Sequence, residues 1–134
     1  MSAVIEQDIL DILQDEGLRK SLGPYHGAAY ATRIKWLSGA FNHQKLPQGE
    51  WWSIWLMLAG RGAGKTRSAA EWVRDMAKRT DKGQLRFALV ARTAADVRDV
   101  IVEGESGIIS VSPPSERPLY EPSKRRLTWP NGNT

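Results

Sequence analysis

The sequence predicts an α/β fold in which helices flank a parallel sheet. Three observations lead to this prediction. A short apolar run at residues 51–58 leads into a glycine-rich loop and then a helical pattern at Lys65–Arg79. A second apolar run at residues 86–91 precedes another helical pattern. The order strand, helix, strand, helix is typical of a right-handed parallel unit.

Composition limits the class of protein. The chain has 134 residues, of which 41% are hydrophobic and 25% charged, so it is the size of one domain and can form a core. It contains no cysteine, which excludes disulfides and thiolate metal sites. The N-terminal stretch MSAVIEQDILDIL lacks the basic start of a signal peptide, and no apolar run approaches the ~18 residues of a membrane span. We therefore expect a soluble cytoplasmic protein.

Charge is distributed unevenly along the chain. Residues 1–50 hold five Lys and Arg against six Asp and Glu, whereas residues 51–134 hold fourteen against nine. A basic second part suits contact with phosphate or nucleic acid. A solvated basic surface explains the same excess without any partner.

Two helices are expected before the first apolar run. Apolar residues at helical spacing predict a helix at residues 4–22, which Gly23 and Pro24 end. The same spacing predicts a helix at Ala28–Phe41, with one apolar face formed by Tyr30, Ile34, Leu37 and Phe41.

The central part contains the elements of the expected sheet. Residues 51–58 and 86–91 are short and apolar, which predicts two buried strands. The helix at Lys65–Arg79 between them should face inward through Ala69, Val73, Met76 and Ala77. Thr93 and Asp96 have the spacing of a capping box, which opens a helix towards Glu103.

The tail has a different pattern. Two prolines at 113 and 114 break the chain, and Pro118–Glu121 and Arg125–Trp129 then predict a hairpin. Its cations and aromatics could contact a DNA backbone, or the aromatics could pack inward while the cations are solvated. These residues are Arg117, Tyr120, Lys124, Arg125, Arg126 and Trp129. The tryptophans at 36, 51, 52 and 55 are interpreted as core or subunit contacts.

The stretch LAGRGAGKTRSAAEW at residues 58–72 predicts a phosphate-binding loop followed by a helix. Such a loop needs a backbone that turns several N–H groups towards one anion, a helix N-terminus, and a lysine. Gly60, Gly62 and Gly64 permit the bend. Lys65 would neutralise the outer phosphates of ATP, and the Thr66 hydroxyl would bind Mg²⁺.

The loop departs from the strict pattern G-x-x-x-x-G-K-[ST] at one position, since Ala59 stands where the first glycine is expected. Alanine is tolerable there if its φ is negative. A glycine-rich turn with an incidental lysine is the alternative, and the glycine spacing does not fit a dinucleotide fingerprint. Arg61 is either a solvated loop residue or a second cation that stabilises phosphoryl transfer. The expected nucleotide contacts are Gly60, Arg61, Gly62, Ala63, Gly64, Lys65, Thr66 and Arg67.

Three blocks resemble the ATPase domain of tailed-phage terminase large subunits, a family also found in gene transfer agents. They are WLMLAGRGAGKTRSAAEWVR, ALVARTAADVRDVIVEGESGII and YEPSKRRLTWPNG, and the resemblance covers residues 44–134, leaving 1–43 as a helical segment. It implies a P-loop NTPase fold of the ASCE, RecA-like kind. The family often has an arginine four residues before the lysine, as Arg61 is here, and a glutamine near the adenine. Gln44 is our choice for that glutamine, Gln48 is the rival, and a polar loop residue without a role is the alternative.

The resemblance also implies an activity. Terminases couple ATP hydrolysis to translocation of duplex DNA into a capsid, within the cytoplasm of a bacterial host. They act as a homo-oligomeric ring with a small terminase subunit and a portal, and they carry a C-terminal RNase H-like nuclease domain.

Hydrolysis requires a Walker-B strand that ends in Asp-Glu, and no such sequence follows Thr66. Asp96 and Asp99 lie on a predicted helix, where we expect them to face solvent. The chain therefore resembles the first part of a terminase ATPase domain, and we expect weak binding of ATP with Mg²⁺ and poor hydrolysis. Another P-loop ATPase of the helicase kind, or a non-catalytic assembly module, is the alternative.

Overall fold

The computed structural model describes residues 14, 27–47, 51–79, 83 and 85–134. The chain divides into two compact units, Met1–Lys45 and Leu46–Thr134, which are treated separately below. Apart from Gln14, the predicted helix at residues 4–22 lies outside the described residues. Within those ranges, no helix has both the length and the apolar character needed to cross a bilayer.

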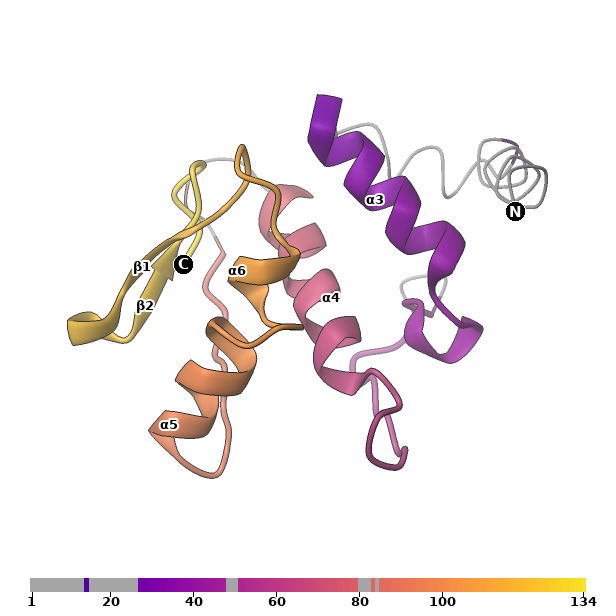
Figure 1. Cartoon of the computed structure of the whole chain (residues 1–134), viewed down its shortest axis with the longest axis horizontal. Helices are drawn as coiled ribbons and strands as arrows, with labels where there is room; N and C mark the ends of the chain where they lie inside the picture. Colours follow the sequence, from indigo (N-terminus) through magenta and orange to yellow (C-terminus); the bar gives the residue numbers. More distant parts are fainter. Residues whose placement is uncertain (1–13, 15–26, 48–50, 80–82, 84) are drawn as a thin grey trace. The chain divides into compact units, whose positions relative to one another are not determined.

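The first unit contains helix α3 (Gly27–Gly39) and the short 3₁₀ turn η1 (Asn42–Gln44) (Figure 1). α3 confirms the second predicted helix. Ile34 and Leu37 are buried on it, with Tyr30 and Trp36 packed alongside. Phe41 was expected on the same face, which is wrong: α3 ends before it, and Phe41 is 69% exposed.

The second unit is built around helix α4 (Lys65–Arg79), which begins and ends where the sequence predicts. The elements that follow are α5 (Ala94–Asp96), the π-helical turn η2 (Val97–Val102), α6 (Ile108–Val111), β1 (Leu119–Glu121), η3 (Pro122–Lys124) and β2 (Arg126–Thr128) (Figure 1). The predicted capping box is confirmed, because Thr93 Oγ1 accepts from the Asp96 N–H and Asp96 Oδ2 accepts from the Thr93 N–H.

The hairpin predicted for the tail is also confirmed. β1 and β2 are antiparallel, with Leu119 opposite Thr128 and Glu121 opposite Arg126. Arg125 lies in the connecting turn with φ 50°, in the left-handed region. The hairpin presents Leu127 to the core of the unit, where this side chain is buried.

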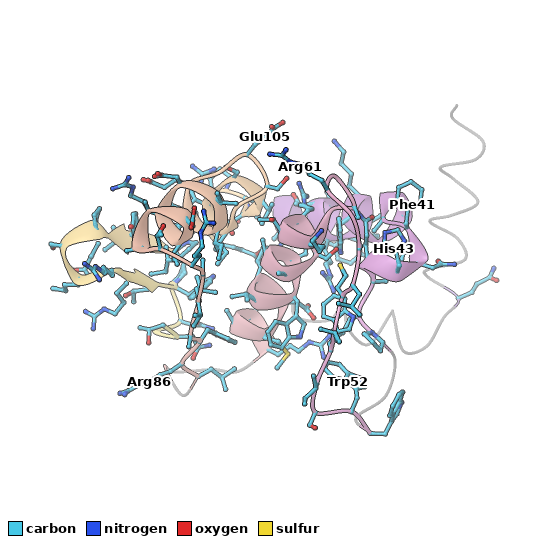
Figure 2. All side chains as sticks on the ribbon, turned by 90° about the horizontal axis from the view of Figure 1, so that it is seen from below. Phe41, His43, Trp52, Arg61, Arg86 and Glu105 are labelled. Atoms are coloured by element: carbon cyan, nitrogen blue, oxygen red, sulfur yellow. The ribbon has the colours of Figure 1, made fainter. Side chains whose placement is uncertain are left out.

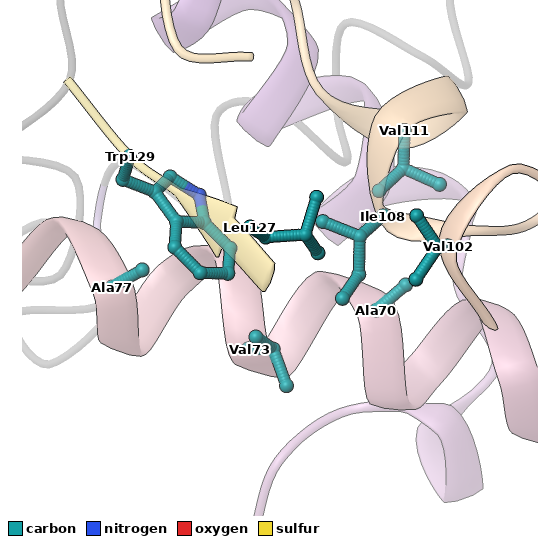
Figure 3. Close-up of a cluster of buried hydrophobic side chains, with 8 residues drawn as sticks. All are labelled: Ala70, Val73, Ala77, Val102, Ile108, Val111, Leu127 and Trp129. Atoms are coloured by element: carbon teal, nitrogen blue, oxygen red, sulfur yellow. The ribbon is translucent and has the colours of Figure 1, made fainter. Parts of the chain in front are cut away.

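One hydrophobic cluster holds the second unit together (Figure 3). Its buried members come from α4, η2, α6 and the hairpin: Ala70, Val73, Ala77, Val102, Ile108, Val111, Leu127 and Trp129. Val73 and Ala77 were predicted to face inward, whereas Ala69 is exposed and Ala70 takes its place. The buried stripe therefore begins one residue later than the sequence pattern indicates.

A turn near the end of the chain caps the C-terminal end of α4. The side-chain amides of Asn131 and Asn133 donate to the Ala77 carbonyl at 2.7 and 2.6 Å. This carbonyl is among the last four of the helix, which have no intrahelical donor. Asn133 is completely buried, and its Oδ1 also accepts from the Leu85 N–H. Asn133 thus joins the C-terminal end of α4 to the backbone at Leu85.

Neither apolar run belongs to a sheet in the described part of the chain, where β1 and β2 form the only sheet. In the first run Ile54 and Leu58 are 82% and 85% exposed, so its expected burial is not found. The second run is buried only in part: Phe87 and Leu89 pack against the core, whereas Val90 is 83% exposed. Burial of a central strand requires neighbours on both sides, which these runs lack here. The parallel sheet remains a prediction.

One backbone contact does follow the pattern of a parallel ladder. The Thr134 N–H donates to the Leu85 carbonyl at 3.1 Å, and the Phe87 N–H donates to the Thr134 carbonyl at 2.7 Å. In a parallel pair one residue bonds in this way to two residues that flank its partner. Residues 85–87 therefore already have one parallel neighbour.

Candidate phosphate-binding loop

The backbone between residue 58 and α4 turns through two glycines. Gly62 and Gly64 have φ of 81° and 78°, a region that costs other residues about 1–2 kcal/mol. Gly60 has no positive φ, and a Cβ there would meet nothing within 4 Å. Two of the three predicted glycines are therefore required by the backbone. Ala59 is also outside the left-handed region, which is the condition under which alanine fits this position.

Lys65 closes the loop across its opening. Its Nζ donates to the carbonyl oxygens of Ala59 at 2.8 Å and Gly60 at 2.6 Å. An ammonium group has three N–H donors, so one remains for another acceptor. The lysine thus ties the start of the loop to the first residue of α4 and keeps its positive charge at the loop.

The first turn of α4 adds a second source of positive potential. The Ser68 N–H donates to the Gly64 carbonyl at the start of the helix, and the N–H groups of Lys65 and Thr66 precede every carbonyl that the helix itself could offer them. The first turn has no acidic residue, whereas the last turn holds Lys78 and Arg79. No carboxylate of the first turn therefore offsets the positive end of the helix dipole.

A buried ionic network fixes the start of the helix. Arg67 donates to Glu71 Oε1 through Nη2 at 2.7 Å and Nε at 3.1 Å, and Glu71 Oε2 lies 3.1 Å from Arg74 Nη2. The side chains of Glu71 and Arg74 are each 1% exposed. The guanidinium of Arg67 is therefore held along the helix rather than towards the loop. The role of Glu71 was not anticipated, although a carboxylate four residues after Arg67 has the spacing of a helical ion pair and could have indicated it.

Of the remaining predicted site residues, some lie in the loop and others lie elsewhere in the chain. Arg61 is exposed at the tip of the loop (Figure 2), while Ala63 and Thr66 are half-buried. Gln44 belongs to the first unit, where its Oε1 accepts from the Phe41 N–H at 2.9 Å. Gln48 lies outside the described residues. The adenine role of Gln44 and the phosphate role of Arg61 stay predictions.

In the basic tail the aromatic side chains pack inward, which is the second of the two alternatives expected from the sequence. Trp129 is 6% exposed and contacts Phe87 edge-on, and Tyr120 packs against the same cluster. Lys124 and Arg126 both pair with Glu121, at 2.6 and 3.3 Å. The hydrogen bond from Lys124, with a further one from Arg126, lowers the pKa of the Glu121 carboxyl. These contacts reduce the charge that the hairpin offers to a DNA backbone.

The carboxylates on the helix after residue 91 also have local partners. Asp99 is exposed as expected and pairs with Arg98, and the hydrogen bond from Arg98 lowers the pKa of Asp99. Asp96 accepts from the Thr93 N–H in the capping box and is half-buried. No group of three or more His, Asp or Glu side chains forms a metal site within the described ranges.

A comparison with known protein families shows to which family the chain belongs. Residues 56–134 match the family model described as terminase large subunit, T4likevirus-type, N-terminal. The chain belongs to this family. The matched region contains the loop, α4 and the hairpin, and it confirms the resemblance found in the three sequence blocks. No curated protein and no solved structure matches the chain.

Membership in the terminase family supports a role in viral DNA packaging, with DNA and other phage proteins as partners. The matched region is the N-terminal part of the large subunit.

Proposed function

We propose that this terminase-family chain binds ATP with Mg²⁺ through residues 60–67 and forms the nucleotide-binding part of a DNA-packaging motor. The observation that supports this most is the position of Lys65. Its ammonium group bridges the carbonyls of Ala59 and Gly60 at the N-terminus of α4 and retains one donor. Lysine, helix end and left-handed glycines thus coincide at one loop, as phosphate binding requires.

The residues of the loop fit the chemistry of a nucleotide triphosphate. Backbone N–H groups of Gly62, Ala63 and Gly64 would surround the phosphates, and the third donor of Lys65 would reach the outer ones. The hydroxyl of Thr66 is an oxygen ligand of the kind that Mg²⁺ prefers. Bound Mg²⁺ would neutralise phosphate charge. The role of Gln44 near the base remains the prediction drawn from the family resemblance.

Arg61 is proposed as a second cation on the phosphates. It is exposed at the tip of the loop, so its side chain is available to a ligand (Figure 2). If it contacts the γ-phosphate, Arg61→Gln weakens ATP binding more than ADP binding. An equal effect on both nucleotides, or none, would instead favour the solvated alternative.

Hydrolysis by the 134-residue chain should be slow. Residues 67–134 contain no apolar run that ends in Asp-Glu, the element that holds Mg²⁺ and orients the attacking water. For the complete motor we propose the family's ASCE-type parallel sheet, and the parallel contact of Thr134 with residues 85–87 supports it. From the family resemblance we also propose that the complete motor translocates duplex DNA as a homo-oligomeric ring. Its proposed partners are a small terminase subunit and a portal, and its proposed further domain is a nuclease.

Nucleotide titration tests the proposal. We expect affinity to decrease in the order ATP, ADP, AMP, and to decrease when Mg²⁺ is removed, because the contacts are to phosphates. Phosphate release should stay near the uncatalysed background. Equal affinity for all three nucleotides would overturn the phosphate assignment, and no binding at all would favour a non-catalytic assembly module. Rapid turnover would overturn the claim of slow hydrolysis.

A further inference from the structure

Ser68 is a buried serine one turn into α4, and both of its hydrogen-bond donors reach the same oxygen. The residue is 2% exposed. Its backbone N–H donates to the carbonyl oxygen of Gly64 at 2.9 Å, and its Oγ donates to the same oxygen at 3.0 Å. A carbonyl oxygen has two lone pairs and can accept both bonds. One helical residue therefore restrains the last carbonyl of the glycine-rich loop through two hydrogen bonds.

The peptide plane that follows Gly64 needs such a restraint. Gly64 directly precedes the first residue of α4 and has a φ of 78°. Glycine has no Cβ and populates positive and negative φ about equally well. This freedom permits the bend of the loop, but for the same reason steric contacts do little to fix the orientation of the adjoining peptide. The two hydrogen bonds from Ser68 supply that orientation instead.

The restrained plane also contains a donor at the candidate phosphate site. The carbonyl of Gly64 and the N–H of Lys65 belong to one peptide group, which is planar and trans, so they point in opposite directions. The Gly64 carbonyl points into α4, towards Ser68. The Lys65 N–H therefore points out of the N-terminal end of α4, on the side where helix ends bind phosphate.

We propose that Ser68 is a positioning residue of the phosphate-binding loop. Its hydroxyl holds the Gly64–Lys65 peptide in the orientation that directs the Lys65 N–H at a phosphate group of the nucleotide. The role depends on the nucleotide binding proposed above. Ser68 itself does not contact the ligand, because its hydroxyl is buried and bonded to Gly64. A donor that is already oriented needs no reordering when the ligand binds, and this preorganisation increases affinity.

The Ser68→Ala substitution separates loop orientation from folding. In the variant the Gly64 carbonyl keeps its bond from the backbone N–H of residue 68, so the start of α4 is retained. Alanine is also the better helix former, which offsets part of the lost side-chain bond. The peptide plane, however, keeps only one of its two restraints from this residue. ATP affinity should therefore respond more strongly than stability does.

Ser112 provides a matched control, because it makes the same kind of bond away from the loop. Ser112 is also 2% exposed, and its Oγ donates to the Ile108 carbonyl, four residues earlier, at 2.7 Å. Serines commonly bond in this way to a carbonyl one helical turn before them. If the Ser68 bond only satisfies a buried hydroxyl, Ser68→Ala and Ser112→Ala should have equal effects on ATP binding.

The test compares ATP affinity between variants of the 134-residue chain. Fluorescent ATP with Mg²⁺ is titrated into the wild type, Ser68→Ala and Ser112→Ala. Ser68→Ala should weaken binding about fivefold, which corresponds to the loss of one typical hydrogen bond. Ser112→Ala should change affinity by less than about twofold, because its acceptor belongs to α6. Urea unfolding should show that Ser68→Ala loses no more stability than Ser112→Ala.

The amide resonance of Lys65 supplies a spectroscopic signature of the peptide plane. In the wild type, saturating ATP with Mg²⁺ should shift this resonance, because the N–H becomes a donor to phosphate. In Ser68→Ala the shift at saturation should be smaller, since a less well-aligned N–H makes a weaker hydrogen bond. A role confined to folding would leave the shift at saturation unchanged.

The Lys65→Ala variant distinguishes failure of this role from failure of the proposed function. If Lys65→Ala loses ATP binding while Ser68→Ala binds as the wild type does, the positioning role is wrong and the phosphate loop stands. Equal losses in Ser68→Ala and Ser112→Ala, or a wild-type Lys65 shift in Ser68→Ala, would also overturn the positioning role. If Lys65→Ala keeps its ATP affinity, the proposed function fails, and the positioning role fails with it.

Discussion

Lys65 Nζ lies 2.6 Å from the carbonyl oxygen of Gly60, so the first residue of α4 is bonded to the residue that opens the glycine-rich loop. This contact fixes the loop as a closed ring beside a helix N-terminus. It also shows that alanine at position 59 is compatible with the closed loop. The lysine bonds to the backbone carbonyl of Ala59, which does not depend on the side chain.

The glycines of the loop should differ in their tolerance to substitution. Gly62→Ala and Gly64→Ala force a Cβ into the left-handed region, at a cost of about 1–2 kcal/mol each, and should weaken ATP binding by distorting the loop. Gly60→Ala should leave stability and ATP affinity nearly unchanged, because a Cβ there meets nothing. Melting temperature and fluorescent-ATP binding measure the two effects. The backbone account fails if Gly60→Ala is as damaging as Gly62→Ala.

Asn133 should matter more for stability than Asn131. Asn133→Ala removes the acceptor of the Leu85 N–H and one donor to Ala77, and loss of such buried partners costs about 1–3 kcal/mol. Asn131→Ala leaves Ala77 with its bond from Asn133 and otherwise removes a long bond of 3.3 Å from the Asn133 N–H to Asn131 Oδ1, so it should cost less than about 1 kcal/mol. Urea unfolding of both variants gives the comparison, and equal midpoints would contradict this description of the cap.

The Glu121 carboxyl should titrate below the ordinary glutamate value of 4.5, because Lys124 and Arg126 stabilise its charged form. Its contribution to the hairpin is complete above pH 4.5 and is lost as pH falls through the lower folded-state pKa. Carboxyl NMR titration measures the midpoint directly. Lys124→Met should raise it, whereas Arg117→Met should not move it. A wild-type midpoint at or above 4.5 would be inconsistent with these ion pairs.

Elements governed by local signals were predictable from the sequence. The bounds of α4, the Thr93–Asp96 capping box and the hairpin depend on side-chain spacing and turn residues within a few positions. The capping of Ala77 by Asn131 and Asn133 depends on residues more than fifty positions apart, so no local pattern shows it. The burial expected for Ile54 was not found for the same reason, since it depends on neighbouring strands.

The candidate site was predictable to a similar extent. Spacing identified Lys65 and the glycine-rich loop, because phosphate binding requires that order of residue types. It did not show that Gly60 is free of a positive φ, nor that Glu71 holds Arg67 along the helix. The first fact depends on backbone angles, whereas the i,i+4 spacing of Arg67 and Glu71 could have indicated the second. The roles of Arg61 and Gln44 still depend on resemblance to the family.

ATP affinity of the Lys65→Ala variant tests the central claim most directly. Lys65 is exposed, and among the described residues its side chain is hydrogen-bonded to two loop carbonyls, so its removal should change folding stability by less than about 0.5 kcal/mol. Lys35→Ala, an exposed lysine of the other unit, is the matched control. We predict that Lys65→Ala loses fluorescent-ATP binding while Lys35→Ala keeps it and both remain folded. Unchanged ATP affinity in folded Lys65→Ala would contradict the assignment of the loop as a phosphate site.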